Sequence, residues 1–159
     1  MSDSSFNKED FLKWIMGLET QVITDELKRT ICEEFELIQD YPKHVIAIDF
    51  DLTICMSDYP NLGPMREGAA EVIRKLYNEG FGIVINTCRA GKAQGMAEDW
   101  LKENNIPFHY INCNFPHLIE FYKADCRKIS ADLYIDDKCL GGLPHWNEIY
   151  KIIQEKFKK

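Results

Sequence analysis

A short apolar run that ends in two carboxylates is the feature that most constrains this chain. The segment HVIAIDFDLT places Asp49 and Asp51 directly after the apolar residues, with Thr53 two positions later. Side chains alternate along a β-strand, so these three side chains are expected to leave the strand end on one side. Two carboxylates about 4 Å apart near a surface repel each other by roughly 4 kcal/mol. We therefore predict a cation between them, and hard oxygen ligands favour Mg²⁺.

The spacing of the other apolar residues predicts alternating strands and helices. We expect strands at 45–50, 81–86, 108–112 and 132–135, and helices at 66–79, at 92–103 and from Pro144 onward. Residues 113–130 show no clear pattern. Strands that alternate with amphipathic helices imply parallel pairing through right-handed crossovers. The predicted fold class is therefore α/β, a three-layer Rossmann-like sandwich with a parallel sheet, in which ligands bind outside the carboxyl ends of the strands.

Residues 1–42 have a different pattern from the rest of the chain. Their apolar spacing predicts two amphipathic helices, and Pro42 interrupts that spacing. We therefore divide the chain into an N-terminal helical extension at 1–42, packed on or beside the core, and an α/β catalytic domain at 43–159.

The composition argues against several classes of partner. The 159 residues carry a formal net charge of −7, and an acidic surface attracts little nucleic acid or anionic membrane. The six cysteines form no CxxC pair and no zinc-binding spacing. The N-terminus lacks a secretory pattern, and no apolar stretch approaches the roughly 20 residues that cross a bilayer. We expect a cytoplasmic protein with reduced thiols and no membrane partner.

The predicted strand ends carry a candidate for each role in phosphate-monoester hydrolysis. The Asp49 carboxylate could attack phosphorus and form an aspartyl-phosphate, while Asp51 protonates the leaving oxygen and later activates water. Asp136 could add a third acidic ligand for Mg²⁺, and Lys128 could neutralise the phosphoryl oxygens. Thr87 and the backbone N–H groups beyond it could hold those oxygens, as loops that enter a helix often do.

Four stretches resemble, in order, the four motifs of the haloacid dehalogenase (HAD) superfamily of phosphohydrolases. They are Asp49-Phe50-Asp51-Leu52-Thr53, Ile85-Asn86-Thr87, Lys128 and Tyr134-Ile135-Asp136-Asp137. The resemblance covers about residues 43–158 and implies a Mg²⁺-dependent phosphatase that works through an aspartyl-phosphate. It implies that Mg²⁺ contacts the Asp49 carboxylate, the Asp51 main-chain carbonyl and Asp136, with Asp137 in support. Leu52 departs from the family, which often has Gly there, and Lys123 is an alternative to Lys128 as the site lysine.

The predicted site residues fall into three roles. The catalytic residues are Asp49, Asp51 and Lys128; the phosphate- or substrate-binding residues are Thr53, Thr87, Cys88 and Arg89; and the metal ligands are Asp49, Asp51, Asp136 and Asp137. For Arg89, a second phosphate or a carboxylate of the substrate and a simple surface ion pair are both open.

The spacing between the motifs leaves no room for a cap domain, so the chain resembles a capless member of the superfamily. In that family an open site accompanies a large substrate or a partner subunit that acts as the lid, so a homo-oligomer that covers the site is one expectation. The expected substrate is a phosphorylated small molecule.

Two alternative functions stay open. One is a nucleic-acid-end phosphatase similar to the phosphatase part of polynucleotide kinase phosphatases, which the acidic charge disfavours. The other is a non-hydrolytic phosphoacceptor or binding module.

Overall fold

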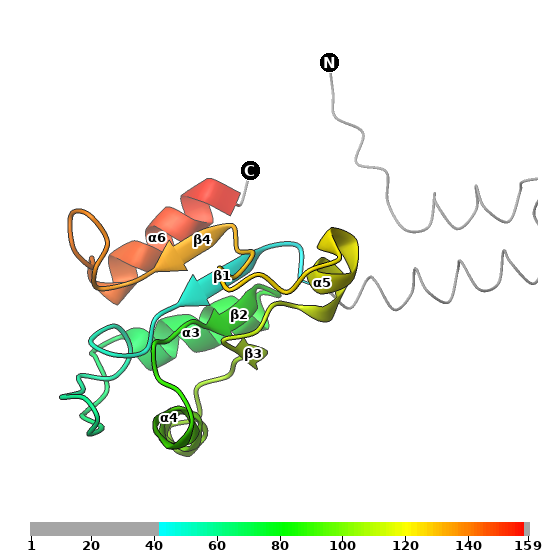
Figure 1. Ribbon diagram of the computed structural model, residues 1–159. Helices are drawn as coiled ribbons and strands as arrows, with labels where there is room; N and C mark the ends of the chain where they lie inside the picture. The colour runs from blue at the N-terminus through cyan, green and yellow to red at the C-terminus, as the bar shows by residue number, and fades with distance from the viewer. Residues whose placement is uncertain (1–41, 158–159) are drawn as a thin grey trace, which may run out of the picture. The chain divides into compact units, whose positions relative to one another are not determined.

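The described part of the chain is built on a four-stranded, all-parallel sheet (Figure 1). The computed structural model describes residues 42–157. The strands are β1 (Val45–Ile48), β2 (Gly82–Ile85), β3 (Tyr110–Ile111) and β4 (Leu133–Ile135), in the order β3-β2-β1-β4. The predicted α/β fold with a parallel sheet is confirmed. The chain divides after Tyr41 into two units, and the second unit holds every described residue. The helical extension predicted at 1–42 therefore lies outside the described residues, except for Pro42.

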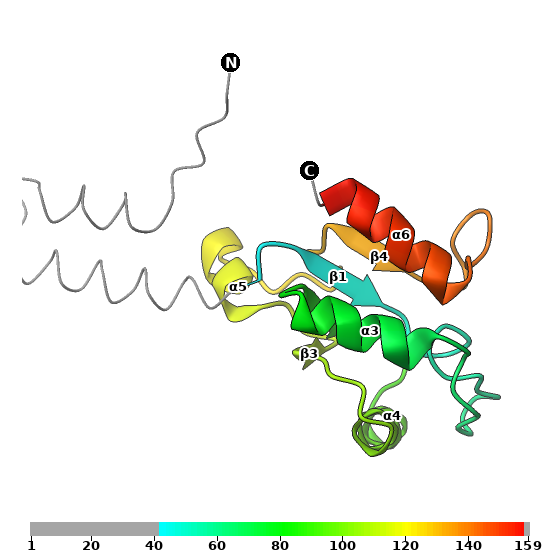
Figure 2. The same cartoon turned by 180° about the vertical axis from the view of Figure 1, so that it is seen from behind.

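Four helices accompany the sheet in the described part. They are α3 (Ala69–Asn78), α4 (Lys92–Glu103), α5 (Pro116–Tyr122) and α6 (Trp146–Phe157). Figure 2 shows α3 and α6 together on one face of the sheet. Three of the four were predicted from hydrophobic spacing, whereas α5 lies in the stretch for which the sequence showed no pattern. None of the helices among residues 42–157 is long and apolar enough to span a membrane.

The core is built on the sheet face that α3 and α6 cover. Ile46 and Ile48 of β1 are fully buried there, in one cluster with Ile73 and Leu76 of α3 and with Ile153 of α6. The same cluster receives Trp100 of α4, whose ring meets Phe50 edge-on with 5.5 Å between the ring centroids. The alternating residues of each strand therefore face the other side of the sheet.

That alternation decides where the acidic residues lie. Ala47 of β1 stands opposite Tyr134 of β4 in the parallel register, and both side chains point away from the core cluster. Asp49 follows Ala47 by two residues and Asp136 follows Tyr134 by two, so the two acids emerge at the same sheet face. The strand order reverses between β1 and β4, and in open α/β sheets ligands bind at that switch point.

Candidate active site

Three carboxylates converge where β1 and β4 end. Asp49 follows β1, and Asp136 and Asp137 follow β4; one carboxylate oxygen of each lies within 4.8 Å of the others. All three side chains are half-buried. Three hard oxygen donors at this spacing fit the preferences of Mg²⁺. The structure therefore brings together three of the four predicted metal ligands.

The protonation of Asp49 reflects this crowding. The pKa of Asp49 is raised from its ordinary value of 3.8 to about 6. Burial is the largest cause and the charges of Asp136 and Asp137 add to it, while the hydrogen bond from Thr53 acts in the opposite direction. An anion that is unfavourable for these reasons is the group that a bound cation would stabilise most. The raised pKa of Asp49 and the three carboxylate oxygens therefore both favour a cation at this position.

Thr53 joins the ends of the two strands underneath the cluster. Its hydroxyl donates to Asp49 Oδ2 at 2.9 Å and accepts from the backbone N–H of Asp137 at 3.0 Å. Its own carbonyl accepts a hydrogen bond from the indole of Trp146 at 3.3 Å. Because Thr53 is fully buried, it has no exposed surface for the phosphate contact that was predicted, and it orients Asp49 and Asp137 instead.

Asp51 does not face Asp49 across a cation as the sequence suggested. Its carboxylate is held by Arg89, whose Nε lies 3.0 Å from Oδ2 and whose Nη2 lies 2.7 Å from Oδ1. The Ser57 hydroxyl also donates to Asp51. Burial raises the pKa of Asp51, but the hydrogen bonds from Arg89 and Ser57 outweigh it and hold that pKa below its usual range. The prediction of one cation between the two acids is therefore wrong, because β1 ends at Ile48 and the chain then turns Asp51 towards Arg89.

Arg89 is one of the most deeply buried side chains in the protein. It is 1% exposed, and its guanidinium carbon lies 5.3 Å from the ring centroid of Phe50 and 5.2 Å from that of Tyr59. Its remaining donors bind the carbonyls of Pro60 at 2.9 Å and Asn61 at 3.2 Å. The residue therefore clamps the loop after β1 onto the loop after β2, and any contact with substrate would require this clamp to open.

The loop after β2 is organised by its own hydrogen bonds. The Thr87 hydroxyl accepts from the backbone N–H of Arg89 at 3.1 Å, and the Thr87 N–H donates to the side chain of Asn112 at 2.8 Å. Thr87 is nearly buried, whereas Cys88 is exposed. Asn112 was missed by the sequence reasoning, although it follows the third strand in the same way that Asp49 follows the first.

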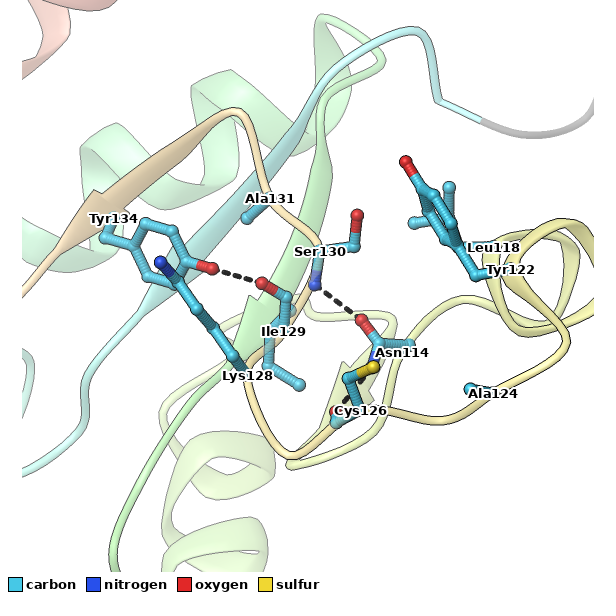
Figure 3. A pocket seen from close by; sticks show the side chains of 10 residues that line it. All are labelled: Asn114, Leu118, Tyr122, Ala124, Cys126, Lys128, Ile129, Ser130, Ala131 and Tyr134. Carbon is cyan, nitrogen blue, oxygen red and sulfur yellow. Dashed lines mark hydrogen bonds between the residues drawn. The ribbon is translucent and has the colours of Figure 1, made fainter.

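The lysines are arranged differently from the prediction. The Lys128 ammonium lies over the ring of Tyr134, 5.3 Å from its centroid (Figure 3), and thus on the same sheet face as the carboxylates. Lys123 instead pairs with Glu120 at the end of α5. The lysine beside the cluster is Lys138, whose Nζ lies 3.4 Å from Asp137 Oδ1. One exposed ammonium does not balance three carboxylates, so the cluster keeps an excess of acidic groups over basic ones.

The raised pKa of Asp49 predicts a stability difference that depends on pH. Because the folded pKa of about 6 exceeds 3.8, the charged carboxylate destabilises the folded state above pH 6, and this penalty vanishes as the pH falls towards 3.8. Without metal, Asp49→Asn should stabilise the protein at pH 7 by about 1–2 kcal/mol, the full linkage value being reduced because water screens a half-buried group. Urea unfolding at pH 7 and pH 4 measures it; an equal difference at both pH values would contradict the burial of Asp49.

Two solved structures resemble this chain. A conserved protein from Bacteroides thetaiotaomicron is 34% identical, and the match covers 71% of this chain and 91% of that one with a TM-score of 0.65. A crystallised target protein from Vibrio cholerae is 29% identical over 43% of this chain and 67% of that one, with a TM-score of 0.37. No protein-family model and no curated protein matches the chain.

Proposed function

We propose that this chain, which belongs to the same family as the conserved Bacteroides thetaiotaomicron protein, is a Mg²⁺-dependent phosphatase. Its proposed substrates are phosphate monoesters of small molecules. The observation that carries this proposal is the convergence of Asp49, Asp136 and Asp137 within 4.8 Å, at the strand ends where α/β folds bind ligands. A cytoplasmic location is part of the proposal, and the described cysteines are free thiols.

The cation would be held by the three carboxylates, with the Asp51 main-chain carbonyl as the further ligand that the resemblance implies. When bound, Mg²⁺ would neutralise negative charge and hold the phosphoryl oxygens in position. Its binding would also favour the anionic form of Asp49, which burial and the neighbouring acids disfavour. The nucleophile would then be ionised at neutral pH.

Asp49 is the proposed nucleophile. One carboxylate oxygen forms a bond to phosphorus while the phosphorus–oxygen ester bond breaks, and the leaving oxygen takes the electron pair and a proton to become an alcohol. A water oxygen then attacks the phosphorus of the aspartyl-phosphate while Asp51 accepts a proton from that water, the bond to Asp49 breaks, and inorganic phosphate leaves with the Asp49 carboxylate restored. Thr53 keeps the carboxylate in position through its 2.9 Å hydrogen bond.

The residues around the nucleophile would have supporting roles. Asp51 stays the proposed general acid and base, but to donate a proton it has to gain one and loosen its contact with Arg89. The N–H of the exposed Cys88 would bind a phosphoryl oxygen, since the N–H groups of Thr87 and Arg89 beside it already donate to Asn112 and Thr87. Lys128 could reach the same oxygens by leaving the Tyr134 ring, because its side chain is exposed and long.

Magnesium binding gives a test that does not need a substrate. We expect MgCl₂ to raise the thermal midpoint of the wild-type protein, because a ligand at about 100 times its Kd stabilises the folded state by roughly 2.7 kcal/mol. Asp136→Asn should abolish the shift, whereas Asp99→Asn on the exposed side of α4 should keep it. A midpoint that is insensitive to Mg²⁺ in the wild type would remove the basis of the proposal. Turnover of p-nitrophenyl phosphate with and without Mg²⁺ then tests the activity.

One observation favours a second candidate, a phosphoacceptor that hydrolyses slowly. The same Arg89 contact that lowers the pKa of Asp51 would weaken it as a base for the second step, so that phospho-Asp49 would persist. Intact mass spectrometry after incubation with acetyl phosphate and Mg²⁺ distinguishes the two. Persistent phosphorylation without release of inorganic phosphate would favour the phosphoacceptor.

A further inference from the structure

The side chain of Asn112 continues a hydrogen-bond ladder at the point where its backbone leaves the sheet. In the parallel register of β2 and β3, Ile111 stands opposite Ile85, and the Asn112 N–H donates to the Ile85 carbonyl at 2.8 Å. A regular parallel ladder would next bring the Asn112 carbonyl to the Thr87 N–H. Asn112 instead adopts φ 50°, which asparagine tolerates better than most residues, and its side-chain Oδ1 accepts from the Thr87 N–H at 2.8 Å. The strand therefore ends at Asn112 without releasing the loop that follows β2.

The same side chain binds this loop at a second point. Asn112 Nδ2 donates to the Arg89 carbonyl at 3.3 Å and to Gln94 Oε1, on α4, at 3.4 Å. The Arg89 N–H in turn donates to the Thr87 hydroxyl at 3.1 Å. The loop is thus held on both sides of Cys88, whose N–H lies between the two fixed residues. A loop that is fixed in this way needs little reordering when a ligand binds.

Hydrogen bonds join this loop to the proposed nucleophile and to the proposed general acid. The loop follows β2, which is paired with β1, and the Asn86 N–H donates at 2.8 Å to the carbonyl of Ile48, the residue before Asp49. At its other end the Arg89 guanidinium binds Asp51 at 2.7 Å. The backbone position of the loop therefore decides where its N–H groups lie relative to Asp49, and it also decides how Asp51 is held.

We propose that Asn112 is a positioning residue for the phosphoryl group: it fixes the loop after β2 so that the Cys88 N–H donates to a phosphoryl oxygen bound at Asp49. The proposal rests on the proposed phosphatase function and adds a residue to the same site. Asn112 is exposed, so core packing does not account for its contacts with the loop. Donors that are fixed before the substrate arrives stabilise its charge without a cost of reorganisation, and the hydrogen bonds of Asn112 supply that order.

The test compares the same substitution at two asparagines with the same backbone conformation. Asn112→Gly removes the side chain and keeps the left-handed conformation, which glycine adopts without strain. Asn105→Gly is the matched control, because Asn105 has φ 53°, is exposed, and keeps the carbonyl that accepts from Arg74. We expect Asn112→Gly to weaken the binding of inorganic phosphate, measured by calorimetry with MgCl₂, by about tenfold, and to lower kcat/KM for p-nitrophenyl phosphate by about tenfold or more. Asn105→Gly should change each by less than about twofold.

Two further measurements separate positioning from a general loss of structure. The proposed metal ligands follow β1 and β4, so Asn112→Gly should keep the Mg²⁺-induced rise in thermal midpoint; loss of that rise together with phosphate binding would overturn the proposal. In the wild-type protein, which needs no variant to fold, phosphate should slow hydrogen exchange of the Cys88 amide. Unchanged exchange at Cys88 in the presence of bound phosphate would also overturn it.

The outcomes distinguish this proposal from the phosphatase function. Wild-type phosphate affinity and turnover in Asn112→Gly would overturn the positioning role and leave the phosphatase standing. Phosphate binding by the wild type without turnover would overturn the phosphatase, and weaker phosphate binding by Asn112→Gly would then still support the positioning role. A wild-type protein that neither binds phosphate nor hydrolyses the ester would overturn both.

Discussion

Asp49→Asn is expected to abolish Mg²⁺-dependent hydrolysis of phosphate monoesters. An amide is a poor nucleophile towards phosphorus, and loss of a covalent nucleophile commonly costs at least about 10³-fold in kcat. The same substitution removes one of the three carboxylates that lie within 4.8 Å, so the Mg²⁺-induced rise in thermal midpoint should weaken as well. Initial rates with p-nitrophenyl phosphate at saturating MgCl₂ measure the first effect.

Stability and activity should move in opposite directions in this variant. Asp49→Asn is expected to be more stable than the wild type in the absence of metal, because it removes a buried charge. Loss of turnover therefore cannot be attributed to unfolding. Asp99→Asn, an exposed substitution of the same chemistry on α4, serves as the matched control. If Asp49→Asn keeps turnover within tenfold of the wild type, Asp49 is not the nucleophile.

Arg89→Met is expected to destabilise the protein more than any other single change considered. The guanidinium is buried and binds Asp51 and the carbonyls of Pro60 and Asn61. Its removal leaves a carboxylate without its counter-charge and two carbonyls without their donor. Breaking a buried pair from one side typically costs about 3–5 kcal/mol. Urea unfolding gives the change in the free energy of unfolding.

A double-mutant cycle identifies the source of that loss. Asp51→Asn removes the stranded charge, so Arg89→Met with Asp51→Asn should be less destabilised than the sum of the two single changes. Arg74→Met is the matched control, since Arg74 is exposed and donates to the carbonyls of Asn104 and Asn105; it should cost less than about 1 kcal/mol. Additive effects of Arg89→Met and Asp51→Asn would mean that the pair is not coupled.

Sequence reasoning predicted the sheet well because its signals are local. The buried strands β1 and β2 are short apolar runs, and α4 was predicted with the bounds Lys92–Glu103 that the structure shows. The convergence of Asp49 with Asp136 also follows from topology, because the carboxyl ends of parallel neighbours meet at one edge of the sheet. The helix α5 was missed because its seven residues are too short for a periodic stripe; Pro116 begins it, and Lys123 ends it in the left-handed conformation at φ 55°.

The partners of individual charges could not be predicted in the same way. Asp51 was assigned to a shared cation because strand alternation was assumed to continue past Ile48. The strand ends there, and Leu52 adopts φ 58°, so the chain turns before Thr53. The pairing of Asp51 with Arg89 joins residues 38 positions apart, and no local pattern encodes such a contact. For the same reason the position of Lys128 over Tyr134, rather than at a carboxylate, was visible only in three dimensions.

The placement of β4 has a mechanical consequence. This strand has three residues and one neighbour in the sheet, and short edge strands are among the elements that open most readily in local unfolding. Asp136 and Asp137 follow it directly, while Asp49 follows β1, a strand with neighbours on both sides. An ion shared between them would act as a clasp across the fold. Dissociation of the ion and local unfolding of β4 would then occur together. Amide hydrogen exchange in Leu133–Ile135 should therefore slow as magnesium is added.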